Sequence, residues 1–116
     1  MMNKTRAAVG FAMKAGKCVS GEFAAERACG GKKAALIVID PGASEATLKR
    51  WTNRSENLNI PMLTLEDMGQ AIGKEARMVA VITDRGFAEM IMNARMKEID
   101  NAKNGGVDEW QKCQRP

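Results

Sequence analysis

The stretch that decides the fold is AALIVI at residues 34–39, a continuous apolar run. It lies between two lysines at 32–33 and the turn-forming sequence DPG at 40–42. A short apolar run without polar alternation is typical of a strand buried on both faces, as in a sheet covered by helices on each side. A second such run, MVAVI at residues 78–82, predicts a second buried strand.

Helical signals surround these two runs, because apolar residues recur at the spacing of one helix face and capping residues precede them. In order, the sequence predicts a helix over 3–15, a strand over 17–20, a helix over 21–30, the strand 34–39, a helix over 44–54, a strand over 60–63, a helix over 64–72, the strand 78–82 and a helix over 84–99. This alternation implies a central sheet with helices on both faces.

The expected helix ends rest on particular residues. Ser44 and the Thr83-Asp84 pair are predicted N-caps, and TLED at 64–67 has the form of a capping box. Gly73 is expected to end the helix that this box opens. The two late helices are expected to bury the following residues: Leu65, Met68 and Ile72 in the first, and Phe87, Met90, Ile91 and Ala94 in the second. Because aromatic residues are scarce, we expect an aliphatic core with methionine as filler.

The length of 116 residues fits one domain, expected over residues 1–100, followed by a flexible C-terminal tail over 101–116. The net charge of +4 is unevenly distributed. Residues 1–33 carry seven basic and two acidic side chains, a net charge of +5, and the remainder is close to neutral. This asymmetry favours an anionic partner such as RNA, although a solvated basic surface would have the same composition.

Several classes of function lack their signatures. The sequence has no histidine, and Cys18, Cys29 and Cys113 form no C-x-x-C pair, so no metal site or disulfide framework is indicated. Neither phosphate-cradling glycine motif occurs. We therefore expect no enzyme activity and no cofactor, two buried core thiols at Cys18 and Cys29, and a third thiol in the tail. No apolar run is long enough to span a bilayer, and no signal peptide is recognisable, which favours the cytoplasm.

One constellation points to RNA. Ser20-Gly21-Glu22 opens the second helix with free backbone N–H groups, which suit phosphate or sugar oxygens. Arg27 lies two turns along that helix, and Lys32 and Lys33 follow its end. A glycine-containing loop at 73–77 precedes the last strand and ends in an arginine. Loops of this kind suit folded RNA, where unstacked bases and sugar edges are exposed.

Four segments resemble one known family: VGFAMKAGK at 9–17, SGE at 20–22, GQAIGKEAR at 69–77 and VITDRGFA at 81–88. Together they are similar to the L-seven-Ae/L-thirty-e ribosomal protein family, in its bacterial YlxQ-like branch, over residues 3–95. The resemblance implies a three-layer α/β/α sandwich around a mixed four-stranded sheet. It also implies binding to structured RNA, kink-turns or ribosomal RNA, in which the second helix enters a widened groove and a late loop covers a protruding base.

The family's RNA-binding positions can be transferred residue by residue. Combined with the basic residues singled out above, the expected RNA-binding set is Lys17, Gly21, Glu22, Phe23, Ala24, Arg27, Lys32, Lys33, Lys74, Glu75, Ala76 and Arg77. Two departures stand out. Kink-turn readers of the family carry Asn-Glu where this chain has Phe23-Ala24, and they carry an acidic segment where this chain has DPGAS at 40–44. Phe23 is either a core residue or a surface on which an RNA base stacks.

Two other classes of function remain as alternatives. A protein–protein adaptor would keep this fold and lose RNA binding, and a small enzyme would need a pocket with converging ionisable side chains. RNA binding with a steep salt dependence would distinguish an RNA-binding protein from the adaptor.

Overall fold

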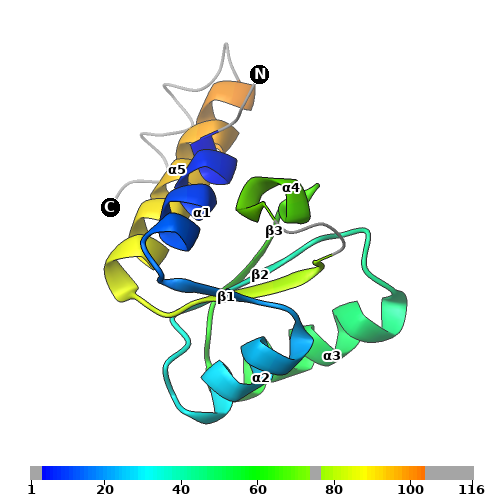
Figure 1. The fold of residues 1–116 in the computed structure, drawn as a ribbon. Coiled ribbons are helices and arrows are strands. Elements are labelled where there is room, and N and C mark those ends of the chain that lie inside the picture. The colour runs from blue at the N-terminus through cyan, green and yellow to red at the C-terminus, as the bar shows by residue number, and fades with distance from the viewer. Residues whose placement is uncertain (1–3, 74–76, 104–116) are drawn as a thin grey trace.

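The computed structural model describes residues 4–73 and 77–103, with residues 99–103 as backbone only. Its elements are α1 (Lys4–Lys14), β1 (Cys18–Ser20), α2 (Glu22–Gly30), β2 (Leu36–Ile39), α3 (Glu45–Leu58), β3 (Met62–Thr64), α4 (Met68–Ile72), β4 (Val79–Ile82) and α5 (Arg85–Lys103). The four strands form one sheet in the order β1-β4-β2-β3 (Figure 1). Strands β2 and β3 are parallel, and the other neighbours are antiparallel.

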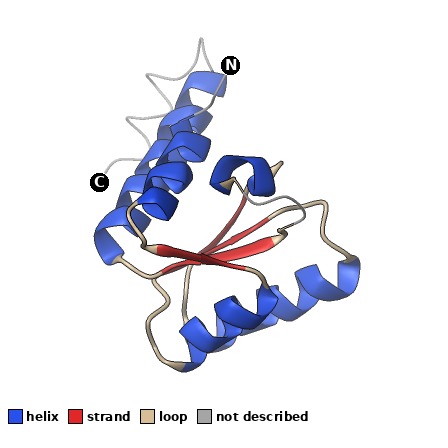
Figure 2. Cartoon of the chain, viewed as in Figure 1, coloured by secondary structure: helices blue, strands red, loops and turns tan. Residues whose placement is uncertain are grey.

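Helices cover the sheet on both faces. Helices α1, α4 and α5 lie on one side, and α2 and α3 lie on the other (Figure 2). The predicted three-layer sandwich with a mixed four-stranded sheet is therefore confirmed. Every residue of the central strands β2 and β4 is buried, as their unbroken apolar runs predicted.

The core consists of two halves separated by the sheet. Successive side chains of a strand point to opposite faces. Leu36 and Val38 accordingly pack with α1, α4 and α5, whereas Ile37 and Ile39 pack with α2 and α3. Each half therefore depends on both central strands, and loss of either strand would expose both apolar faces.

The expectation of a purely aliphatic core is wrong at one position. Trp51, on α3, is fully buried and is the largest side chain in the core half beneath α2 and α3. The guanidinium of Arg54 lies 4.8 Å from the centre of the indole ring. The sequence signal was weak because Trp51 is surrounded by polar residues of an otherwise hydrophilic helix.

Most predicted helix ends are confirmed. The Ser44 hydroxyl accepts a hydrogen bond from the Thr47 N–H, and Asp84 accepts bonds from the N–H groups of Gly86 and Phe87. Gly73 ends α4 in the left-handed conformation. Helix α3 extends four residues beyond the predicted end, to Leu58, and α5 continues to Lys103, into the segment expected as a tail. The remaining tail lies outside the described residues.

The expected capping box at 64–67 is wrong. Helix α4 begins only at Met68, and the Asp67 side chain makes no capping hydrogen bond. Residues 62–64 belong to β3, so Thr64 is extended and pairs opposite Ile39. Thr64, which was expected to cap the helix, is therefore part of the sheet. The expected burial of Leu65, Met68 and Ile72 is confirmed.

Methionine is a smaller part of the core than expected. Ile91 of α5 is buried and Phe87 and Ala94 are half-buried, but Met90, predicted to be buried, is 37% exposed. Ala88 is buried on this helix instead. Met92 and Met96 are also exposed. Helix α5 therefore packs on the core through Phe87, Ala88, Ile91 and Ala94.

The expected burial of Cys18 and Cys29 is confirmed, and Cys113 lies outside the described residues. Burial raises the pKa of the Cys18 thiol from 9.0 to about 11 and also raises the pKa of Cys29, where Arg54 opposes the shift and Glu26 adds to it. Because the thiolate is the nucleophile, mild alkylation at pH 8 should label Cys113 fastest. Mass spectrometry of the labelled peptides tests this, and rapid labelling of Cys18 would contradict it.

The same shift predicts a loss of stability in alkali. The buried Cys18 stays neutral in the folded protein at a pH where the unfolded chain has already released the proton. Its contribution is therefore complete below pH 9.0 and is lost as the pH rises towards about 11.

Candidate nucleic-acid interface

Helix α2 begins at a glycine that is fixed to the sheet. Gly21 has a φ of 91°, a conformation that favours glycine, and its N–H donates to the Val79 carbonyl at 2.8 Å. The bond places the start of α2 against the beginning of β4. No described side chain caps this helix end. The backbone N–H groups of its first turn have no partner within the helix, which leaves them able to bind an anion.

Arg77 reaches the same place from the other predicted segment. A Cβ atom at residue 21 would lie only 2.4 Å from the Arg77 Nη1 atom, so the guanidinium lies directly against Gly21. The structure thus brings together Gly21 and Arg77, which lies two residues before β4, although they are 56 positions apart in the sequence. Lys74, Glu75 and Ala76 lie outside the described residues.

The acidic side chains of α2 are paired with α3, which lies beside α2 (Figure 1). Glu22 Oε1 is 2.7 Å from Arg50 Nη2, and Glu26 Oε1 is 3.5 Å from Arg54 Nη1. These partly exposed pairs contribute little to stability, about 0–1 kcal/mol each, but they neutralise both carboxylates. Glu22 is therefore held by α3, and Arg50 is a basic residue near the helix start that sequence reasoning missed. The matching four-residue spacing of the two glutamates and two arginines was the available signal.

Phe23 and Arg27 occupy the solvent side of α2, while Ala25, Ala28 and Cys29 pack into the core. The Phe23 side chain is 75% exposed, so its placement in the core is excluded. The Arg27 guanidinium carbon lies over the ring, 5.8 Å from its centre. Ala24 is half-buried. Next to Gly21 and Arg77, α2 thus presents an aromatic face and an exposed cation.

The remaining basic residues of the expected set lie at the other end of the sheet. Lys17 precedes β1 and its carbonyl accepts from the Thr83 N–H, just after β4 ends. Lys32 and Lys33 precede β2 and line a groove with Thr83 and Arg85. All three lysines are exposed. The sequence suggested one surface, but the structure separates these lysines from Gly21 and Arg77 by the length of the central strands.

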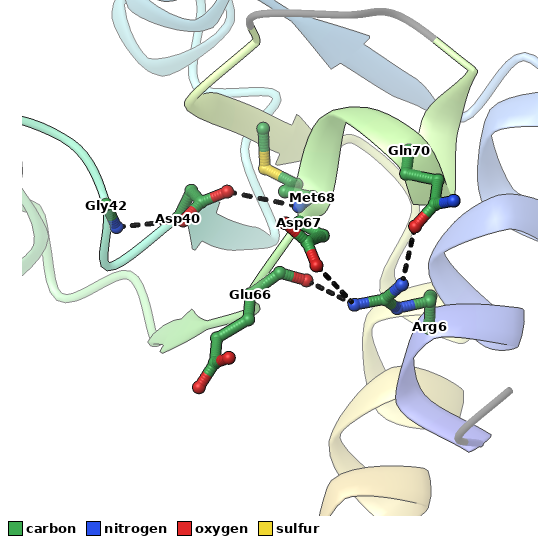
Figure 3. Close-up of polar contacts among 7 residues, drawn as sticks. All are labelled: Arg6, Asp40, Gly42, Glu66, Asp67, Met68 and Gln70. Atoms are coloured by element: carbon green, nitrogen blue, oxygen red, sulfur yellow. Dashed lines mark hydrogen bonds and ion pairs between the residues drawn. The ribbon is translucent and has the colours of Figure 1, made fainter. Parts of the chain in front are cut away.

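Asp40, which follows β2, fixes the start of α4 (Figure 3). One carboxylate oxygen accepts from the Met68 N–H at 3.2 Å, and the other accepts from the Gly42 N–H at 2.8 Å. Asp40 therefore does the work expected of the capping box and also shapes the turn before α3. Asp40 is the first residue of the DPGAS segment, which differs from the acidic segment of the family, and these two hydrogen bonds are its role here.

Arg6 of α1 holds α4 from the opposite side (Figure 3). It donates to the Glu66 carbonyl at 2.7 Å and to the Gln70 Oε1 at 3.0 Å, and lies 3.8 Å from the Asp67 carboxylate. Helix α4 is thus fixed at its beginning by contacts from two directions. Since the chain continues from α4 to Arg77, these contacts also set where that connection begins.

Within residues 4–73 and 77–103, no three histidine, cysteine, aspartate or glutamate side chains gather as a metal site would require. Among the helices described, none is both long enough and apolar enough to cross a membrane.

The fold and this surface define a class: an α/β/α sandwich domain in which the start of the second helix and a late loop form one polar and aromatic surface. No family model matches the chain. It is 34% identical over 88 residues to the RNA-binding protein YlxQ of Bacillus subtilis (strain 168), covering 73% of this chain and 88% of that protein. It is 31% identical over 84 residues to the RNA-binding protein YlxQ of Enterococcus faecium, covering 70% and 81%. The chain belongs to the YlxQ-like branch of the L-seven-Ae/L-thirty-e ribosomal protein family.

Solved structures share the fold. A protein with unknown function from Bacillus halodurans C superposes with a TM-score of 0.75 and 24% identity, covering 80% of this chain and 97% of that one. The Giardia lamblia 15.5kD RNA binding protein superposes with a TM-score of 0.64 and 17% identity, covering 80% and 86%. At these identities the likeness establishes the architecture.

Proposed function

We propose that this protein binds structured RNA in the cytoplasm, without catalysis and without a cofactor, through the start of α2 and the loop that ends at Arg77. The observation that carries the proposal is the position of the Arg77 guanidinium against Gly21, at the start of the helix that carries the exposed Phe23 and Arg27. The family relationship supports it, because the curated relatives are named RNA-binding proteins.

The electrostatics of α2 suit a phosphate backbone. The uncapped first turn supplies N–H groups and the positive end of the helix dipole. Arg27 and Arg77 add guanidinium groups, which donate to phosphate in a planar fork. The carboxylates of Glu22 and Glu26 would repel RNA, but Arg50 and Arg54 neutralise them. We propose that Lys74, Glu75 and Ala76 complete this surface, and that bent helices such as kink-turns or ribosomal RNA elements are its ligands.

Lys17, Lys32 and Lys33 play a different part in this proposal. Because they lie at the opposite end of the sheet from Gly21 and Arg77, an RNA confined to the start of α2 would not reach them. We place them as phosphate contacts for a longer RNA that follows the edge of the domain. Phosphate contacts of this kind increase affinity without reading sequence.

Binding to a kink-turn hairpin is expected to weaken as salt rises, because each phosphate contact releases condensed counterions. With four contacts, affinity should fall by roughly three to four orders of magnitude for each tenfold rise in salt, from the slopes for single strands and for duplexes. Fluorescence anisotropy with a labelled hairpin at several salt concentrations measures the slope. Absence of binding even at low salt would favour the protein–protein adaptor.

Replacing Arg27 by alanine is expected to weaken RNA binding by about 1–3 kcal/mol, the usual range for an arginine contact. Folding should be little affected, since the side chain is exposed and contacts mainly the Phe23 ring. Lys97→Ala is the matched control, because it also removes one exposed positive charge but lies on α5, across the sheet. Equal losses in the two variants would show that only net charge matters.

A further inference from the structure

We infer that the Phe23 ring is a stacking platform for an unpaired RNA base, so that the RNA ligands of this chain carry an unpaired base beside a helix. The inference rests on the proposed function and specifies its ligand. It concerns the position where kink-turn readers of the family hydrogen-bond to G·A pairs. A phenyl ring has neither donor nor acceptor and can engage a base only through the base's face.

The high exposure of the Phe23 ring indicates that a ligand covers it. Its 75% exposure is the largest of any large apolar side chain in the described part of the chain. The helix does not need the ring for folding, because Ala25, Ala28 and Cys29 supply the buried face of α2. A phenylalanine at this position therefore leaves apolar area in water that a stacked base would cover.

Arg27 orders the ring from one side. It lies one helical turn after Phe23, and its guanidinium carbon sits over the ring at 5.8 Å from the centre. Cation–π contact holds both side chains in one arrangement. The opposite face of the ring stays available, which gives the stacking order guanidinium, ring and base. The guanidinium edge keeps its donors for the phosphate adjoining that base.

The surroundings supply the rest of a nucleotide site. The uncapped start of α2 directly precedes Phe23, and the Arg77 guanidinium lies against Gly21, two residues before the ring. Cationic and N–H donors are therefore near the ring. Aromatic stacking tolerates every base, because each base has a π-face. The expected selectivity is therefore for an unpaired over a paired base, with little preference for its identity.

The test uses a hairpin with one bulged 2-aminopurine, whose fluorescence is quenched when it stacks. A fully paired hairpin and a hairpin with an abasic site at the bulge are the matched RNAs. Phe23→Leu removes the ring and keeps an apolar side chain, whereas Phe23→Trp keeps an aromatic face. Phe11→Leu is the control variant, because Phe11 is 60% exposed on α1, on the opposite face of the sheet.

The parent, Phe23→Trp and Phe11→Leu should bind the bulged hairpin and quench its fluorescence. Phe23→Leu should lose the quenching and bind roughly 5- to 150-fold more weakly, the range for one stacked base. The parent should discriminate against the abasic hairpin by a similar factor. Equal affinity and quenching for Phe23→Leu, or equal binding of the abasic RNA, would overturn this inference alone. Failure of the parent to bind any of the RNAs would overturn the proposed function as well.

Discussion

Replacing Trp51 by alanine should lower the free energy of unfolding by about 3–5 kcal/mol, the largest effect on stability that we expect from a single change. The side chain is fully buried and fills the core half formed with Ile37, Ile39 and Val79. Its removal loses apolar burial and leaves a cavity, and small domains are stable by only about 5–15 kcal/mol in total. Urea denaturation followed by far-UV circular dichroism measures the change.

Two further variants separate packing from other causes. No described group accepts a hydrogen bond from the buried Trp51 Nε1, so Trp51→Phe should cost less than Trp51→Ala, since it leaves a smaller cavity and breaks no hydrogen bond. Lys49→Ala, at an exposed position of the same helix, should change stability by less than about 0.5 kcal/mol. A loss below about 1 kcal/mol for Trp51→Ala would contradict the central role of this residue.

The second large effect is a change of RNA preference. The double variant Phe23→Asn with Ala24→Glu should strengthen binding to a kink-turn by about 2–6 kcal/mol, because two side chains would then hydrogen-bond to base edges, at about 1–3 kcal/mol for each good contact. The variant should fold, since Phe23 is exposed and a glutamate in the first turn of α2 is favoured by the helix dipole. Anisotropy titrations of parent and variant against one kink-turn measure the gain.

The control for this prediction is in the RNA. When the G·A pairs of the kink-turn are replaced by Watson–Crick pairs, the gain should vanish. The same variant should bind the bulged 2-aminopurine hairpin more weakly than the parent, because it lacks the ring. If the parent already binds the kink-turn tightly and in a G·A-dependent manner, then backbone and loop contacts suffice, and Phe23 does not set the preference.

The sheet was predictable because its central strands are almost pure apolar runs. Residues 36–39 and 79–82 need no partner information to be recognised as buried strands, and the helices between them follow from spacing and caps. The predicted start of α4 was wrong because residues distant in the sequence make the contacts that decide it. Residues 64–67 have the form of a helix cap, but Thr64 pairs with β2 and Asp40 caps α4 from another loop. A local pattern does not contain such long-range contacts.

The orientation of α2 was not predictable for a different reason. Its buried face consists of Ala25, Ala28 and Cys29, residues that mark an apolar face only weakly, so the larger Phe23 could be assigned to either side. The prediction that the basic residues form one surface was wrong because of the order of the strands in the sheet. Gly21 and Lys32 are both next to α2 in sequence, but they lie at its two ends and therefore at opposite ends of the sheet. Only the strand order shows that Arg77 belongs with Gly21 and Arg85 with Lys32.

The strand order also governs when the protein becomes functional during its synthesis. Of the strands that the structure describes, β4 is the last to leave the ribosome, yet it lies between β1 and β2 and anchors the start of α2 through the Val79 carbonyl. A nascent chain that has emerged only as far as β3 lacks the strand that joins β1 to β2, and it also lacks Arg77. Chains of this length are completed within seconds at ordinary rates of translation. The proposed RNA surface therefore cannot assemble on a growing chain until residues 77–82 have emerged.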